Sequence, residues 1–235
     1  MEFAIAAEGT KFWFLENFNI FRDLKDESMQ ELERITSMQD IRRNQPIYFP
    51  TEPSNSIFFL KKGRVKLTRI SPEGKEMILA LVNMGEVFGE MAFLDEGERN
   101  EFATALDDCL VCAINKNEFK DFVARNPELN LRITKLIGLK LKKYSERIEE
   151  LVFKDAEQRV ISFLLRLANE NGKSIGEEIF VKPFLKHQDI AELTATSRQT
   201  VNAILTDLRE KEVINFDRKK LIIKEKEKLE GKINF

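Results

Sequence analysis

Cysteine and histidine are scarce in this chain: its 235 residues include two cysteines, Cys109 and Cys112, and one histidine, His187. Two cysteines cannot form a disulfide framework, so a reducing cytoplasm is the expected location. One histidine leaves little basis for a His-rich metal site, and we predict that no metal is bound. The scarcity of both residue types therefore disfavours a disulfide-built fold and a histidine-built site.

The chain also lacks long apolar runs and an overall excess of positive charge. No apolar run approaches the roughly 20 residues that a membrane span needs, and the start, Met1-Glu2-Phe3, lacks the basic region and apolar core of a signal peptide. The formal net charge is −2, with 43% hydrophobic and 33% charged residues, which is typical of a soluble globular protein. The charge balance is slightly positive after residue 153 and negative before it, which permits DNA binding by the C-terminal part.

Short alternating strands broken by turn residues are indicated from about residue 41 to 114. This pattern predicts an antiparallel sandwich or barrel, preceded by a short helical entry over residues 13–36. We place the first domain at residues 13–126. The turn residues are Lys62-Gly63, Ser71-Pro72-Glu73-Gly74, Met84-Gly85 and Glu96-Gly97.

Beyond Pro127 the pattern is helical to about Phe153, and apolar residues recur there at spacings of 4, 3, 4 and 3, as in the seam of a coiled coil. The seam packs either on the chain's own β domain or on the same helix of a second copy. The regularity of the repeat favours the second interpretation, so we predict a dimerisation helix at residues 127–153. Its dimerisation residues are Ile137, Leu141, Tyr144, Ile148 and Leu151.

The C-terminal part predicts a winged helix-turn-helix at residues 154–227, followed by a charged tail at residues 228–235. A helix over residues 157–169 precedes an extended piece at residues 178–185. Two short helices joined by a tight turn follow, and a small hairpin at residues 213–224 completes the domain. Helix pair plus hairpin is the pattern of a DNA-binding module.

The second helix of the pair combines an apolar side with a polar side near its start. Thr196-Ser197-Arg198-Gln199 has the pattern of a capping box, in which Thr196 accepts from the amide of Gln199. The polar side chains match the edges of base pairs, and the Arg198 fork suits guanine. Two alternatives stay open: Gln199 only caps the helix, and Arg198 contacts a phosphate. The predicted DNA-binding residues are His187, Gln188, Thr196, Ser197, Arg198, Gln199, Thr200, Asn202 and Thr206.

Cys109 and Cys112 form a C-x-x-C pair, which suggests metal or redox chemistry. They fall, however, in an apparent strand at residues 110–114, where residues three apart point to opposite faces. The sequence holds no second such pair. We therefore predict that both cysteines are core residues.

The order of these parts resembles the Crp/Fnr family of bacterial transcription regulators, from about residue 18 to 225. The resemblance implies an α+β fold class with an N-terminal β jelly-roll sensor domain similar to cyclic-nucleotide-binding domains. A long dimerisation helix and a C-terminal winged helix-turn-helix follow. Besides the long helix, the segments that carry the resemblance are Gly85-Glu86-Val87-Phe88-Gly89-Glu90-Met91-Ala92, Gly97-Glu98-Arg99, His187-Gln188-Asp189-Ile190-Ala191 and Thr196-Ser197-Arg198-Gln199-Thr200-Val201.

The resemblance implies a homodimer that binds near-palindromic double-stranded DNA and contacts RNA polymerase. Where the family often has Glu and Arg, this chain has Gln199 and Ala203, so the preferred half-site should differ from that of the best-known member. The rival hypothesis is a cyclic-nucleotide-binding signalling module whose winged domain binds protein rather than DNA. An enzyme is disfavoured because no nucleophile with a base and an orienting group is visible.

The resemblance also implies effector-binding residues. Glu90 matches the residue that binds a ribose hydroxyl, and Arg99 matches the phosphate-binding arginine. The family's iron–sulfur and haem sensors are disfavoured, because the first cysteine is Cys109 and the sensor domain has no histidine. The candidate effector residues are Phe88, Gly89, Glu90, Met91, Ala92, Arg99, Asn100, Tyr144 and Ser145.

Dependence on cyclic AMP is not favoured. Glu101 places a carboxylate beside the expected phosphate, and two unit charges about 6 Å apart repel by roughly 3 kcal/mol at an effective dielectric near 20. Strand alternation removes this repulsion if it turns Glu101 away. Tyr144 is bulky where the family's adenine-facing residue is small. A cyclic nucleotide, another small anionic effector and activity without an effector all stay open.

Overall fold

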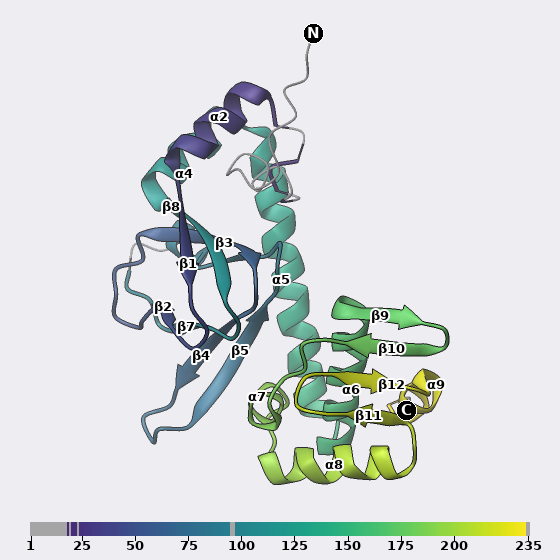
Figure 1. Ribbon diagram of the computed structural model, residues 1–235. Helices are drawn as coiled ribbons and strands as arrows, with labels where there is room; N and C mark the ends of the chain where they lie inside the picture. Colours follow the sequence, from purple (N-terminus) through teal and green to yellow (C-terminus); the bar gives the residue numbers. More distant parts are fainter. Residues whose placement is uncertain (1–17, 19, 23, 95–96, 234–235) are drawn as a thin grey trace. The chain divides into compact units, whose positions relative to one another are not determined.

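The computed structural model describes residues 18, 20–22, 24–94 and 97–233 (Figure 1). Of the predicted helical entry, residues 13–17, 19 and 23 lie outside the described residues, as does Glu96 of the predicted turns. The chain forms two compact units, Met1–Lys140 and Leu141–Phe235. No helix among the described residues is long and apolar enough to cross a membrane.

The first unit is the predicted β module, built from two four-stranded antiparallel sheets (Figure 1). The strand orders are β1-β8-β3-β6 and β2-β7-β4-β5. Glycines in the left-handed region turn the chain at three of the predicted turns, with φ +85° at Gly63, +80° at Gly74 and +88° at Gly85. The strands are β1 Thr36–Ile41, β2 Pro46–Tyr48, β3 Ser56–Lys62, β4 Val65–Ile70, β5 Glu76–Val82, β6 Val87–Phe88, β7 Phe102–Ala105 and β8 Cys109–Asn115.

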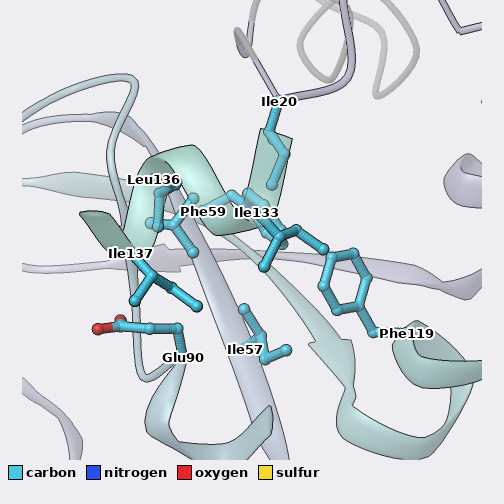
Figure 2. A pocket seen from close by; sticks show the side chains of 9 residues that line it. Ile20, Ile57, Phe59, Glu90, Phe119, Ile133, Leu136 and Ile137 are labelled. Atoms are coloured by element: carbon cyan, nitrogen blue, oxygen red, sulfur yellow. The ribbon is translucent and has the colours of Figure 1, made fainter. Parts of the chain in front are cut away.

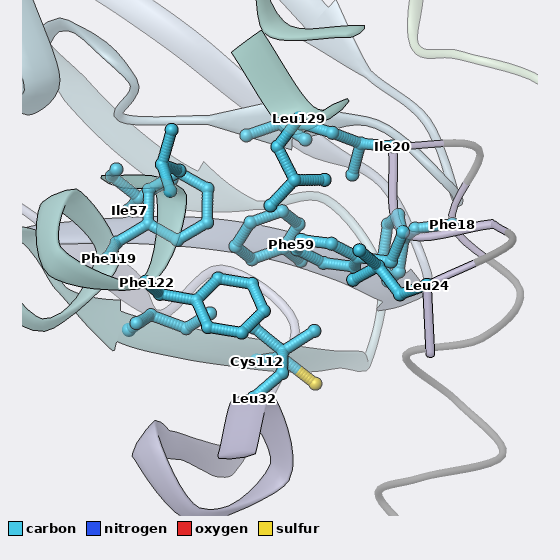
Figure 3. Packing of buried hydrophobic residues seen from close by; sticks show 14 of the residues in the cluster. Phe18, Ile20, Leu24, Leu32, Ile57, Phe59, Cys112, Phe119, Phe122 and Leu129 are labelled. Atoms are coloured by element: carbon cyan, nitrogen blue, oxygen red, sulfur yellow. The ribbon is translucent and has the colours of Figure 1, made fainter. Parts of the chain in front are cut away.

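Strand β3 is buried on both faces and divides the interior of the first unit into two clusters. Phe59 packs in one cluster with Phe119 and Phe122 from α4 (Lys116–Arg125), as Figure 3 shows. Its neighbour Phe58 points to the other cluster. Because a strand alternates its side chains, a continuous apolar run suits this central position. The helices α2 (Asp26–Ile35) and α3 (Met91–Leu94) belong to the same unit.

The same alternation of side chains places the two cysteines of the C-x-x-C pair on opposite faces of one strand. Cys109 and Cys112 lie on β8, are both free and are both buried. Cys112 packs in the cluster around Phe59, whereas Cys109 packs in the cluster around Phe58. The prediction that they are core residues on opposite faces is confirmed.

The long helix α5 runs from Glu128 to Phe153, and its seam changes character along its length. Ile133 and Leu136 pack against the core of the first unit, and Ile137 is half-buried. Seam residue Ile137 lines a cavity of this unit with Ile57 and Phe59, so packing on the chain's own β domain holds for this one member of the predicted seam. The remaining seam residues are exposed, with exposed fractions of 68% for Leu141, 44% for Tyr144, 61% for Ile148 and 42% for Leu151.

The second unit is the winged helix-turn-helix, and in Figure 1 α7 lies at the N-terminal end of α8. Its sheet has the strand order β11-β12-β10-β9, in which β9 was not predicted. The elements are α6 Ala156–Asn171, β9 Gly172–Ile175, β10 Glu178–Val181, α7 His187–Leu193, α8 Arg198–Glu210, β11 Ile214–Phe216, β12 Leu221–Ile223 and α9 Lys226–Gly231.

The segment that we predicted as a charged tail at residues 228–235 is not a separate tail in its described part. Residues Lys226–Gly231 form α9, which packs against α6. Leu229 is fully buried, and Lys232 pairs with Glu157 of α6 at 2.6 Å. One apolar side chain among charged neighbours is enough to dock this helix, because the charged residues stay on its outer side.

Candidate nucleic-acid interface and effector site

Helix α8 is held by the burial of one side. Val201, Leu205 and Leu208 are fully buried, and they recur at the spacing that lines one face of a helix. Ile190 and Ala191 of α7 are buried beside the turn between the two helices. This burial leaves the opposite side of the first turns of α8 free to contact a partner.

The predicted DNA-binding residues divide by exposure. Helix α8 and its cap present Arg198, Gln199 and Asn202 on the surface. Gln188 is exposed as well, but its amide donates to Glu192 at 2.8 Å. The exposed members are Gln188, Ser197, Arg198, Gln199 and Asn202, and the half-buried members are His187, Thr196, Thr200 and Thr206.

The N-terminal cap of α8 lies one residue later than predicted. Ser197 is the N-cap, and its hydroxyl accepts from the amide of Thr200 at 3.0 Å. The expected pairing of Thr196 with the amide of Gln199 is therefore wrong. Two adjacent hydroxyl residues allow either register in the sequence, and the backbone selects Ser197 because it is the last extended residue before the helix. The cap does not use the Gln199 side chain.

His187, the first residue of α7, contacts two other elements of the second unit, α8 and β11. Its ring meets the ring of Phe216 edge to face, with centroids 5.6 Å apart. Burial lowers the pKa of His187, and the charge of Arg198 lowers it further, whereas a hydrogen bond with Asn202 raises it. His187 therefore adjoins both Arg198 and Asn202 and links the start of α7 to the polar side of α8.

The hairpin of β11 and β12 adds basic residues that the sequence analysis left out of the DNA-binding set. Arg218, Lys219 and Lys220 are consecutive and exposed at its tip. Asp217 closes the turn by accepting from the amides of Lys219 at 2.7 Å and Lys220 at 2.9 Å. A run of three basic residues in a predicted turn was the available signal, because such clusters suit phosphate contacts.

In the first unit, the structure brings together two of the predicted effector residues, Gly89 and Arg99. A Cβ on Gly89, whose φ is +68°, would lie 2.9 Å from Nη1 of Arg99. Arg99 itself is buried, its guanidinium carbon lies 3.9 Å from the centre of the Tyr48 ring, and its Nη2 donates to the carbonyl of Ser56 at 2.7 Å. The arginine is thus held by the protein's own groups.

Three stacked aromatic rings fill the interior beside Arg99. Tyr48 and Phe58 have ring centroids 5.6 Å apart, and Phe58 and Phe88 have centroids 5.1 Å apart. All three side chains are buried. The predicted site residue Phe88 is therefore a core residue of this stack.

Glu101 is turned toward this group rather than away from it. Its Oε1 accepts from the Tyr48 hydroxyl at 2.9 Å. Burial raises the pKa of the Glu101 carboxyl, and burial together with the charge of Glu101 raises the pKa of Tyr48. The carboxylate expected near the phosphate position thus lies in the same polar group as Arg99.

Glu90 is paired with the long helix. Its Oε2 lies 2.8 Å from Nζ of Lys140, and the same ammonium donates to the carbonyl of Val87 at 2.8 Å. Figure 2 shows Glu90 beside Ile137 at the edge of an apolar cavity, on the opposite side from Phe119. The lining residues are Ile20, Ile57, Phe59, Val87, Glu90, Phe119, Ile133, Leu136 and Ile137.

The other effector candidates do not join this group. Met91 is 55% exposed, whereas Ala92 is buried. Asn100 is exposed, and its backbone carbonyl accepts from Nε of Arg69 at 3.3 Å. Tyr144 and Ser145 belong to the second unit, where both are exposed.

Comparison with known proteins decides the family. A model of the cyclic nucleotide-binding domain matches residues 38–126, and a model of the Crp-like helix-turn-helix domain matches residues 158–231. The global nitrogen regulator of Nostoc sp. is 30% identical over 207 residues, which cover 87% of this chain and 91% of that protein. The chain belongs to the Crp/Fnr family.

Other relatives of the Crp/Fnr family match nearly the whole chain. The CRP-like cAMP-activated global transcriptional regulator of Mycobacterium tuberculosis is 26% identical over 215 residues, covering 92% of this chain and 96% of the relative. A CooA mutant from Carboxydothermus hydrogenoformans superposes with a TM-score of 0.73 at 27% identity, over 86% of this chain and 89% of that one. FixK2 from Bradyrhizobium japonicum, at 18% identity and a TM-score of 0.73, shares the fold over 84% of this chain and 96% of that one.

These matches establish a transcription regulator of the Crp/Fnr type. They support the DNA-binding hypothesis over the rival signalling module, because the winged domain itself matches the Crp-like helix-turn-helix. The names of the Nostoc and Mycobacterium relatives record nitrogen regulation and activation by cyclic AMP, respectively. Membership of the family therefore leaves the effector of this chain undetermined.

The cap of α8 can be tested by two adjacent substitutions. Ser197→Ala removes the acceptor for the amide of Thr200 and is expected to lower the free energy of unfolding by about 1 kcal/mol. Thr196→Ala keeps that bond and serves as the control, with a smaller loss. Urea unfolding followed by circular dichroism measures both, and a larger loss for Thr196→Ala would contradict the assigned cap.

Proposed function

We propose that this regulator acts as a cytoplasmic homodimer that reads a near-palindromic DNA site and contacts RNA polymerase. In this proposal α8 enters the major groove and has no catalytic role. The observation that carries it is the arrangement of α8: Val201, Leu205 and Leu208 are fully buried, while Arg198 and Gln199 are exposed at its start. Helix-turn-helix proteins read bases with the N-terminal residues of this second helix.

Arg198 is the proposed reader of a guanine. It is exposed in the first turn of α8, where a bidentate contact to O6 and N7 discriminates against a wrong base by about 1–3 kcal/mol. Gln199 adds an amide suited to adenine, because the helix cap does not use it.

Arg198→Ala is expected to relax the preference at one base pair of each half-site while preference elsewhere in the site is kept. Fluorescence anisotropy with duplexes that differ at that pair measures the effect, at one fixed salt concentration. Lys211→Ala, at the end of α8 and paired with Asp207, is the control. Equal weakening on every duplex would instead assign Arg198 to a phosphate.

The proposed dimer surface is the exposed part of the α5 seam. Leu141, Tyr144, Ile148 and Leu151 are each more than two-fifths exposed in the single chain. Apolar residues repeated in this way along one side of a helix suit a parallel pair of such helices. Twofold symmetry would place two copies of α8 on two half-sites.

The double substitution of Leu141 and Ile148 by lysine is expected to give monomers, because four like charges would then lie along the helix pair. Sedimentation equilibrium reports the mass. The matched control replaces Lys142 and Glu149, which are also exposed on α5, by alanine and should leave the dimer intact. A dimer that persists in the lysine variant contradicts this surface.

We also propose that the sensor domain does not depend on cyclic AMP. Arg99 already donates to Ser56 and lies against Tyr48. The Glu101 carboxylate accepts from Tyr48 in the same group, and Glu90 is paired with Lys140. A cyclic nucleotide would have to displace these partners and bring its phosphate near a carboxylate. Another small anionic effector, or none, fits the proposal.

Calorimetric titration with cyclic AMP and cyclic GMP tests this part. No binding is expected at micromolar nucleotide, because the arginine and glutamate that would receive it are already engaged. The Mycobacterium tuberculosis relative, whose name records activation by cyclic AMP, serves as the positive control. Micromolar binding that also tightens the affinity for DNA refutes the proposal.

A further inference from the structure

In the turn between α7 and α8, several backbone carbonyls accept from groups outside these two helices. The last carbonyls of any helix lack intrahelical donors. Here the carbonyl of Ile190 accepts from the amide of Thr194 at 2.9 Å and from its hydroxyl at 2.8 Å, and that of Ala191 accepts from the amide of Thr196 at 3.0 Å. The carbonyls of Leu193, Thr194 and Ala195 accept from arginine side chains.

Arg159 of α6 makes two of these contacts. Its Nε donates to the carbonyl of Thr194 at 2.8 Å, and its Nη2 donates to that of Ala195 at 3.2 Å. The third nitrogen, Nη1, donates to the carbonyl of Lys154 at 2.7 Å, just after α5 ends. One planar guanidinium therefore joins the α5–α6 junction to the turn before α8, which a single ammonium cannot do.

Arg147 makes the remaining contact from α5. Its Nη2 donates to the carbonyl of Leu193 at 3.3 Å. Burial lowers the pKa of Arg147, and the charge of Arg166 lowers it further, yet a guanidinium remains charged at neutral pH. Positive charge at the C-terminal end of α7 is also favourable, because that end of a helix carries a partial negative charge.

The backbone of the turn needs such support. Ala195 has a φ of +49°, a conformation that costs a residue with a Cβ about 1 kcal/mol or more. Two residues later Ser197 caps α8, and Arg198 begins it. The direction in which α8 leaves the turn therefore depends on groups that hold Thr194 and Ala195 in place.

We propose that Arg147 and Arg159 are positioning residues for DNA recognition: bound to the carbonyls of Leu193, Thr194 and Ala195, they fix the orientation of α8. We call this set the turn clamp. The inference rests on the proposed DNA-reading role of α8. Hydrogen bonds to bases need the donor and acceptor atoms to lie within about 0.5 Å of their ideal positions. Electrostatic attraction to phosphates is less sensitive to a tilt of α8.

The test compares Arg159→Lys with the wild-type chain on two duplexes. One is the sequence that the wild type enriches from a randomised library, and the other is a random duplex of equal length. Lysine keeps the charge but cannot reach three carbonyls, so the ratio of the two affinities is expected to fall about tenfold. The dependence on salt should stay unchanged, because Arg159 touches no phosphate in this proposal.

Arg166→Gln is the matched control. Arg166 lies on the same helix as Arg159 and pairs with Glu150 at 3.2 Å, but it makes none of the contacts that define the turn clamp. The ratio of the affinities of Arg166→Gln for the two duplexes should equal that of the wild type. If Arg159→Lys does not fold, Arg147→Gln replaces it, and the same loss of specificity is expected. If the folded variant keeps the wild-type ratio of affinities, the turn clamp is contradicted. The same holds if its affinity falls equally for both duplexes.

Hydrogen exchange without DNA separates the turn clamp from the proposed function. The amides of Thr196 and Thr200 are expected to exchange faster in Arg159→Lys, whereas the amide of buried Leu205 should not change. Faster exchange in a protein whose wild type prefers no DNA sequence would contradict the proposed function and the role in DNA recognition, but it would support the part of the inference that the arginines fix the orientation of α8. If Arg159→Lys exchanges these amides at the wild-type rate and the wild type does read DNA, the turn clamp alone is contradicted.

Discussion

The burial of one side of α8 is the constraint on which the exposed polar side of its first turns depends. Val201, Leu205 and Leu208 are fully buried, and together they remove enough apolar area from water to stabilise the unit by several kcal/mol, at roughly 1.5–3 kcal/mol for each side chain. A rotation of the helix would expose them. The same packing therefore determines that Arg198 and Gln199 face outward, so the proposed contact with DNA depends on the stability of this unit.

In the sensor domain, strand β3 divides the apolar interior, and Arg99 lies in a polar group beside it. Strand β3 alternates Phe58 and Phe59 between two cores, and Arg99 lies against the Tyr48 ring in the polar part beside them. A buried charge of this kind is tolerated only because a carbonyl, aromatic faces and a nearby carboxylate offset its lost hydration. Arg99, which the resemblance offers as an effector residue, is therefore held by groups of the chain itself.

Much of the architecture followed from local patterns in the sequence. Turn residues at regular intervals predicted the β module, and alternation placed Cys109 and Cys112 in the core. The cap register was missed because Thr196 and Ser197 are chemically alike. Helix α9 was missed because a single apolar residue, Leu229, gives no periodicity.

The contacts of the candidate sites were harder to predict, because they join residues distant in the sequence. Nothing local to Glu101 indicates that it accepts from Tyr48, and nothing local to Lys140 indicates that it pairs with Glu90. A family resemblance names positions, but whether a side chain there is available depends on what the fold packs beside it.

Sequence-specific reading of DNA by paired copies of α8 is the central claim, and selection from a randomised duplex library tests it most directly. The account predicts that the wild-type chain enriches an inverted repeat whose half-site centres lie about 10 base pairs apart, one turn of the double helix. Retention of DNA with no enriched motif, lost uniformly as salt is raised, would contradict the account, because it would leave only phosphate attraction.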